Sequence, residues 1–267
     1  MLEVEFAELS DVGTKRDHNE DFLGHFLPQS PGEISGKGCL FVLADGVGGH
    51  ERGEIASHLA VGTLCEGFAR LPASEAHASL LLRLAQQANT NIYEQGAAHT
   101  GPGQRAMATT LVACALRFDR VTVAHVGDSR CYLLRGRQAR QLTQDHTVAA
   151  EQLRLGLISS REAQEAQTSH LLSRSVGGDI FVNVEVNEHR IRTGDVLLLC
   201  SDGLHNVVEG TEMATVLQEN YNLQRAAQRL VDLANQRDGG DNVSVQLIRV
   251  QGVEAVGIYR GRPYRLQ

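Results

Sequence analysis

Two strand-like apolar runs that follow each other through a turn-sized gap constrain the fold of this chain most. Thr110–Leu116 and Val121–Val126 are separated only by Arg117–Arg120. Parallel neighbours need a crossover of a dozen or more residues, whereas antiparallel neighbours need only a turn. We therefore predict sheets that are mainly antiparallel. A doubly wound parallel sheet is excluded, because it would place a helix between most successive strands.

Strand-like and helical segments alternate in blocks along the 267 residues. Further short apolar runs are Cys39–Ala44, Val196–Cys200 and Val243–Val250, and helical spacing of apolar residues marks Glu54–Leu71, Glu75–Gln95, Glu212–Gln218 and Leu223–Gln236. The order is strands, two helices, strands, a helical insert, strands, two helices and a final strand. This order predicts an α+β fold, with a central β-sandwich of two mainly antiparallel sheets flanked by helices on both sides.

The helical insert is predicted to be a flap on the surface. It covers about residues 148–172 and has two short helical patterns around Gly156, with few large apolar residues. The chain has five prolines and no long Ser/Gly or charge tract. We therefore expect a single domain over residues 1–250, without a flexible linker. The C-terminal tail, residues 251–267, is expected to be loosely ordered.

The composition excludes several classes of partner. The net charge is −7 and aromatic residues make up 4% of the chain, which gives no reason to expect nucleic acid or an anionic membrane. No apolar stretch approaches the ~18 residues of a spanning helix, and the start MLEVEFAELS lacks an apolar signal core. Five scattered cysteines without a C-x-x-C pair indicate reduced thiols. We expect a cytoplasmic protein and, without a coiled coil or an exposed apolar helix, a monomer.

Acidic residues recur at the ends of the predicted strands. Asp45-Gly46, Asp202-Gly203 and Asp128 directly follow strand-like runs, and Glu20-Asp21 and Asp241-Asn242 directly precede them. In an antiparallel sheet the end of one strand lies beside the start of its neighbour. All five sites can therefore gather at one edge of the structure, where like charges repel unless cations neutralise them.

The chemistry of this acidic set decides which cation it suits. It offers carboxylates and backbone carbonyls without thiolates. Hard oxygen ligands suit Mg²⁺ or Mn²⁺, whereas zinc sites favour Cys and His. Glycine after Asp45 and after Asp202 allows a tight turn whose carbonyl can face a metal. Each Asp-Gly or Gly-Asp taken alone is a common turn dipeptide, but the five sites together favour a metal centre.

The motifs KRDHNED, LADGVGGH, MATTLV, VGDSR, LTQDHT, LSRSVG, LLLCSDGL and GGDNVSV occur in this order along the chain. The ordered series resembles that of the type 2C (PPM) protein phosphatases, especially the bacterial members, over about residues 8–250. The resemblance implies a sandwich of two antiparallel sheets with a dinuclear metal centre at one end. The implied cofactors are two Mn²⁺ or Mg²⁺ ions per site, with a third ion in bacterial relatives.

The resemblance also assigns metal ligands residue by residue. Asp45 would bridge both metals, and the Gly46 carbonyl would bind one of them. Asp202 and Asp241 would complete one metal shell. Glu20 would serve the other metal, directly or through water.

Other residues of the motifs would act around the metals. Arg16 would bind the phosphate, because a guanidinium fork suits phosphate oxygens. Asp21 would hold water on the metals, and Asn242 would support the start of its strand. His50 is the candidate acid that protonates the leaving alkoxide. His146, at the entrance of the flap, is expected to be structural.

Together these residues imply a metal-dependent protein serine/threonine phosphatase. The two ions would lower the pKa of a bridging water, and the hydroxide would attack phosphorus in line. The third ion would be held by Asp128 together with Asp202. The implied partners are phosphorylated proteins, including a cognate bacterial Ser/Thr kinase. The alternative from another class is a catalytically silent module of the same fold that binds phosphoproteins.

Overall fold

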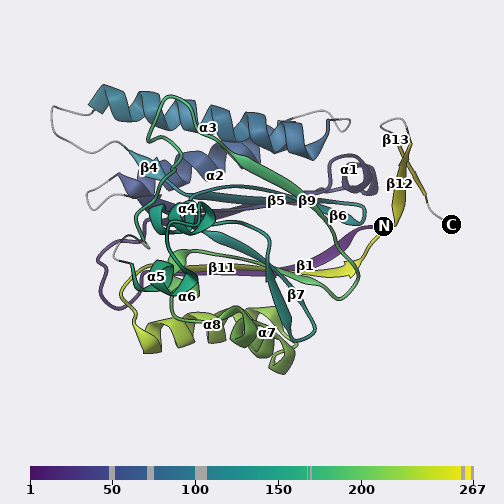
Figure 1. Ribbon diagram of the computed structural model, residues 1–267. Helices are drawn as coiled ribbons and strands as arrows, with labels where there is room; N and C mark the ends of the chain where they lie inside the picture. Colours follow the sequence, from purple (N-terminus) through teal and green to yellow (C-terminus); the bar gives the residue numbers. More distant parts are fainter. Residues whose placement is uncertain are drawn as a thin grey trace.

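The computed structural model describes residues 1–47, 52–70, 75–99, 107–166, 168, 170–259 and 262–265. Within this part of the chain, two antiparallel sheets lie face to face in the middle of the molecule, with helices on both outer sides (Figure 1). The α+β sandwich predicted from the sequence is therefore confirmed.

The strands of each sheet come from distant parts of the chain. The first sheet has the order β1 (Glu3–Asp11), β11 (Val243–Gly252), β10 (Val196–Cys200), β7 (Arg130–Arg135) and β8 (Gln138–Gln141). The second has the order β2 (Asp21–Phe26), β3 (Cys39–Val47), β5 (Leu111–Arg117), β6 (Arg120–Val126) and β9 (Glu185–Arg190), and β4 (Ala108–Thr109) pairs with β3. All of these pairings are antiparallel.

Two pairs of helices cover the outer faces of the sandwich. The helices on the second sheet are α2 (Gly53–Arg70) and α3 (His77–His99), and those on the first are α7 (Gly210–Glu219) and α8 (Leu223–Arg237) (Figure 1). The short helices α1 (Pro31–Gly36) and α6 (Asp202–His205) lie in connections. The four long helices match the four helical patterns of the sequence to within a few residues.

The continuous apolar runs of the sequence form strands that are buried on both faces. In β3, Leu40 and Val42 pack against the helices of the second sheet, while Phe41 and Leu43 pack against the first sheet. Such a strand needs apolar residues at every position, which explains why its sequence does not alternate. Cys114 on β5 has the C-x5-R spacing of a cysteine-dependent phosphatase, but it is fully buried in this layer and cannot meet a substrate.

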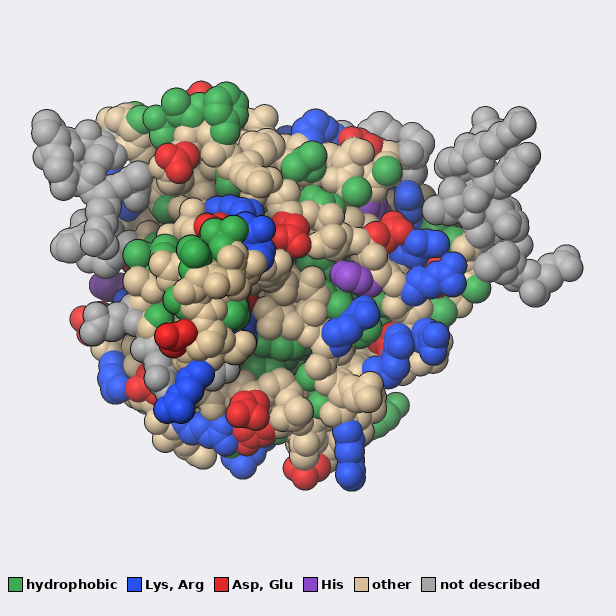
Figure 2. Space-filling view, viewed as in Figure 1, with side chains coloured by type: hydrophobic (Ala, Val, Ile, Leu, Met, Phe, Trp, Pro, Cys, Tyr) green, Lys and Arg blue, Asp and Glu red, His purple; other side chains and the backbone are tan. Residues whose placement is uncertain are grey.

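The segment that the sequence predicts to be a flap contains two short helices between β8 and β9. These are α4 (Val148–Arg154) and α5 (Ser160–Glu165), on either side of Gly156. Figure 2 shows hydrophobic side chains on the surface near α4, where Leu153, Leu155 and Leu157 are exposed. The flap therefore presents more apolar surface than the sequence suggested.

The tail differs from the expectation that it is loosely ordered. Val256–Tyr259 (β12) pairs with Arg262–Arg265 (β13) as an antiparallel hairpin beyond the sandwich (Figure 1). Strand propensity favours this hairpin, because Val256 and Ile258 are β-branched and Tyr259 is aromatic. Among the described residues, no helix is long and apolar enough to cross a membrane.

Candidate metal centre

An acidic pocket of about 250 Å³ lies where the two sheets and the flap meet. The residues that line it are Arg16, Glu20, Asp45, Gly46, Val47, Thr110, Asp128, His170, Leu172, Asp202, Asp241 and Asn242. The structure thus brings together the predicted metal-site residues and the predicted phosphate-binding arginine. Asp21 is buried next to this pocket without lining it. His50 lies outside the described residues.

The carboxylates of the pocket come from both sheets. Glu20 directly precedes β2, and Asp45 lies on β3, both in the second sheet. Asp202 follows β10 and Asp241 precedes β11, both in the first sheet. Asp128 lies in the turn that leads from β6 of one sheet to β7 of the other. Antiparallel pairing therefore collects acids that are far apart in sequence, as the strand-end argument requires.

The strand that carries Asp45 runs further than the sequence predicted. It continues to Val47, because β4 pairs with its last residues. The Asp45 N–H donates to Thr110 Oγ1 at 2.9 Å, and its carbonyl accepts from Thr109 Oγ1 at 2.8 Å. Asp45 also pairs in register with Asp21 on β2. These contacts fix the backbone of Asp45 on both sides.

The glycines after the two aspartates serve close packing of the backbone. A Cβ on Gly46 would lie 2.3 Å from the carbonyl carbon of Gly53, and a Cβ on Gly203 would lie 2.1 Å from the Asn242 carbonyl oxygen. Neither glycine has a positive φ. Neither position therefore requires the left-handed backbone that only glycine adopts freely, and close approach of two chain segments is the physical reason for both glycines.

Asn242 joins the N-terminal loop to the start of β11. Its Oδ1 accepts the Glu20 N–H at 2.8 Å, and its Nδ2 donates to the carbonyls of Val12 and His18, both at 2.9 Å. All the hydrogen-bonding capacity of the amide is directed to the loop that carries Arg16 and Glu20. This side chain thus helps to set the position of the loop against Asp241, together with the hydrogen bond from the Thr14 N–H to the Gly239 carbonyl.

Burial and mutual repulsion raise the pKa values of the clustered carboxyls. Burial raises the pKa of Asp45 well above its ordinary value, and Asp21 and Asp202 raise it further. Burial, with a smaller contribution from Asp202, raises the pKa of Asp128 to about 7. The pKa of Asp21 also rises to about 7, mainly through burial. The protein therefore places too little positive charge near these carboxyls to keep their pKa values at the ordinary level.

The donor set of this pocket fits divalent ions of the Mg²⁺ and Mn²⁺ type. Carboxylates from Asp45, Asp202, Asp241 and Glu20 supply hard oxygen ligands. One oxygen of Asp21, Oδ1, is buried and has no hydrogen-bond partner among the described residues. Buried polar atoms without a partner are rare, and a water or an ion commonly explains them.

Arg16 is at the edge of the pocket and pairs with one of the acids. Its Nη2 donates to Asp241 Oδ2 at 2.9 Å, and both side chains are partly exposed. This hydrogen bond, together with the nearby charges of Glu20 and Asp45, raises the pKa of Arg16. Arg16 is therefore charged and within reach of an anion that enters the pocket.

Sequence reasoning missed the part of the flap that reaches the pocket. His170 and Leu172, at the C-terminal end of the flap, line it. A second cavity of about 260 Å³ shares His170, Asp202 and Asp241 with the first. Only the predicted position of the flap pointed to these residues, because neither stands in an acidic motif.

Comparisons with known proteins agree with this geometry. Residues 18–241 match the family described as protein phosphatase 2C. The chain is 36% identical to the serine/threonine phosphatase stp of Listeria monocytogenes over 242 residues, which are 90% of this chain and 93% of that protein. It is 31% identical to the protein phosphatase PhpP of Streptococcus pneumoniae over 254 residues, covering 94% of this chain and all of PhpP.

Solved structures with the same fold are also similar in sequence. The serine/threonine phosphatase of S. agalactiae superimposes with a TM-score of 0.84 at 33% identity, covering 93% of this chain and 100% of that one. The catalytic domain of the serine/threonine protein phosphatase PstP, solved in complex with two manganese ions, has a TM-score of 0.79 at 32% identity over 94% of this chain and 100% of its own.

Proposed function

Since the chain belongs to the protein phosphatase 2C family and is a metal-dependent protein serine/threonine phosphatase, we propose that the acidic pocket is its active site. One observation carries the proposal. Carboxylates from both sheets face one cavity beside Arg16, and the raised pKa values of Asp45 and Asp128 indicate negative charge that the protein does not balance.

The ligands of two ions in this proposal come from four acids and one carbonyl, and Asp128 together with Asp202 would hold a third ion. Asp45 and the Gly46 carbonyl lie on β3, Asp202 and Asp241 extend from the first sheet, and Glu20 lies in the N-terminal loop. When bound, two Mn²⁺ or Mg²⁺ ions activate water for attack on phosphorus and offset charge on the phosphoryl oxygens.

The protein itself supplies orientation and further charge. Arg16 leaves Asp241 and donates to the phosphoryl oxygens, because a phosphate dianion is a stronger partner than a carboxylate that ions have neutralised. Asp21 accepts a hydrogen bond from Ser201 at 2.7 Å on Oδ2, so Oδ1 remains for a proton of the attacking water. His50 stays a prediction as the acid for the leaving alkoxide.

The substrates are phosphorylated proteins. We infer that the enzyme reverses a cognate Ser/Thr kinase, acts as a monomer in the cytoplasm, and uses neither nucleic acid nor membrane as partner. The five cysteines are free, as suits a reducing compartment. A single domain over residues 1–250 holds the site, with the flap beside the pocket.

A turnover experiment tests the assignment of the site. Purified protein with Mn²⁺ should release p-nitrophenol from p-nitrophenyl phosphate and phosphate from a phosphothreonine peptide, and EDTA should stop both. A phosphotyrosine version of the same peptide is the control for selectivity. Binding of the phosphothreonine peptide without turnover, in protein that binds Mn²⁺, would support the silent binding module instead.

A further inference from the structure

We propose that two histidines, the half-buried His205 and the buried His146, are positioning residues that hold the Gly127–Asp128 turn and thereby fix Asp128 at the wall of the acidic pocket. The inference rests on the proposed role of Asp128 as a metal ligand. It adds residues that touch neither substrate nor metal but determine where a ligand stands.

His205 holds Asp128 itself. Its Nε2 donates to the Asp128 carbonyl at 2.9 Å, and since a carbonyl can only accept, the proton must sit on Nε2. His205 ends α6, the single helical turn that begins with Asp202. The short helix α6 therefore carries Asp202 and also anchors the backbone of Asp128. This arrangement fixes the separation between Asp128 and Asp202.

His146 holds the preceding residue, Gly127. The His146 N–H donates to the Gly127 carbonyl at 2.9 Å, and the Gly127 N–H donates to His146 Nδ1 at 3.2 Å. Gly127 has a φ of +100°, and a Cβ there would lie 2.7 Å from Thr110 Cγ2. Gly127 thus has no side chain that could hold the turn, and the contacts from His146 hold it instead. The His146 carbonyl accepts from the Ser173 N–H at 2.9 Å, which joins both ends of the flap to the same turn.

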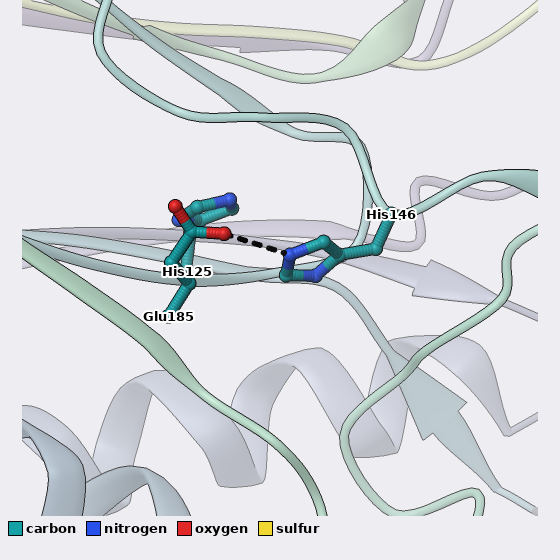
Figure 3. A group of neighbouring side chains, drawn as sticks. All are labelled: His125, His146 and Glu185. Carbon is teal, nitrogen blue, oxygen red and sulfur yellow. Dashed lines mark hydrogen bonds and ion pairs between the residues drawn. The ribbon is translucent and has the colours of Figure 1, made fainter. Parts of the chain in front are cut away.

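The ring of His146 is itself oriented by two neighbours (Figure 3). Its Nε2 faces Glu185 Oε2 at 3.4 Å, and its ring stacks on His125 with centroids 4.7 Å apart. Donor atoms of these three residues lie within 4.8 Å of one another, as in a metal site. However, Nδ1 of His146 is an acceptor, so Nε2 carries the proton and offers no lone pair.

Two further features favour orientation over metal binding in this cluster. The imidazole planes of His125 and His146 are only 19° apart and stacked, so their in-plane lone pairs do not converge on one point. In addition, Nη1 of Arg174 lies 3.4 Å from His146 Nε2 and would repel a cation. The cluster therefore fixes the tautomer and direction of His146.

Both positioning groups are uncharged imidazoles. His146 Nδ1 accepts the Gly127 N–H, and His205 Nδ1 is buried with no acceptor among the described residues for a second proton. A lysine or arginine in their place would donate the same kind of hydrogen bond but would add positive charge beside acids that must attract cations. Neutral donors hold the turn and leave the negative potential of the pocket intact.

The test compares His205→Leu with the matched variant His77→Leu. His77 is a buried imidazole whose Nε2 bonds to the carbonyl of Lys37, the C-cap of α1, at 2.7 Å. Helix α1 lies on the opposite side of the molecule from α4 of the flap (Figure 1). Leucine keeps much of the ring volume and removes the hydrogen bond in both cases. Mn²⁺ binding is measured by calorimetry, and the half-saturating Mn²⁺ concentration by hydrolysis of p-nitrophenyl phosphate.

We expect His205→Leu to weaken Mn²⁺ binding at one site by about 10- to 100-fold, the effect typical of residues that orient a metal ligand. His205→Gln should recover most of this loss, since its amide can donate to the same carbonyl. His77→Leu should lower thermal stability by a similar amount and leave Mn²⁺ binding unchanged. His146→Leu should act like His205→Leu.

Two results would overturn the inference. The first is that His205→Leu and His77→Leu lose the same thermal stability and both bind Mn²⁺ with the affinity of the wild type. The other is Asp128→Ala with unchanged Mn²⁺ binding, which would remove the ligand role of Asp128 as well. If Asp128→Ala weakens binding and neither histidine variant does, the proposed site stands and only the positioning role fails.

Discussion

Replacing Arg16 by alanine should separate phosphate recognition from stability. Arg16 Nη2 lies 2.9 Å from Asp241 Oδ2, and the two side chains are 44% and 39% exposed. Exposed ion pairs of this kind contribute about 0.2–1 kcal/mol, so the unfolding free energy should change little. A hydrogen bond from a charged donor to a phosphoryl oxygen is worth about 1.5–3 kcal/mol. We therefore expect kcat/KM to fall about 10- to 150-fold.

The neighbouring lysine provides a matched control for this prediction. Lys15 pairs with Asp238 at 2.8 Å, is likewise exposed, and does not line the pocket. Lys15→Ala should leave kcat/KM for a phosphothreonine peptide unchanged, while both variants unfold within about 1 kcal/mol of the wild type in urea. A loss of activity below threefold in Arg16→Ala, or an equal loss in Lys15→Ala, would refute the reasoning.

Two further variants, Asp45→Asn and His77→Gln, test other parts of the reasoning. Asp45→Asn should lower turnover by at least about 100-fold, because bound ions contribute several kcal/mol to the transition state. It should also raise the melting temperature of the metal-free protein, since it removes a buried charge among like charges; an unchanged or lower value would contradict this. Burial lowers the pKa of His77 from 6.5 to about 4. Between pH 6.5 and pH 4 the unfolded state therefore binds a proton that the folded state does not bind. The free energy of unfolding should therefore keep its full value above pH 6.5 and fall by about 3 kcal/mol as the pH drops to 4. Urea unfolding of the His77→Gln variant should lack this loss.

The parts of the fold that follow from the sequence are those whose signal is local. The runs that became β3, β5, β6, β10 and β11 are buried on both faces and therefore continuous in apolar residues. The short connection between the runs that became β5 and β6 was enough to predict antiparallel sheets. The strands that were not predicted carry mixed patterns; β9, with the sequence EVNEHR, is mostly polar because it lies at an edge.

The candidate site divides in the same way. Acids at strand ends could be found because antiparallel topology alone brings them to one edge of the sandwich. The supporting contacts could not be found, because each depends on the tertiary position of an ordinary residue. Neither the pairing of Arg16 with Asp241 nor the hydrogen bond from His205 to Asp128 has a spacing that marks it in the sequence. The reason for Gly46 was also hidden, since close approach to Gly53 exists only in the folded chain.

The placement of the acids on both sheets has a consequence for how long the protein survives. Glu20 and Asp45 belong to one sheet, and Asp202 and Asp241 to the other, so an ion held among them ties the two halves of the sandwich together. Ligands that bind only the folded state add their binding free energy to its stability, about 2.7 kcal/mol at a hundredfold excess over Kd. Scarcity of divalent ions would then do more than silence the enzyme. It would also expose the chain to unfolding and proteolysis, so that cellular abundance follows ion supply.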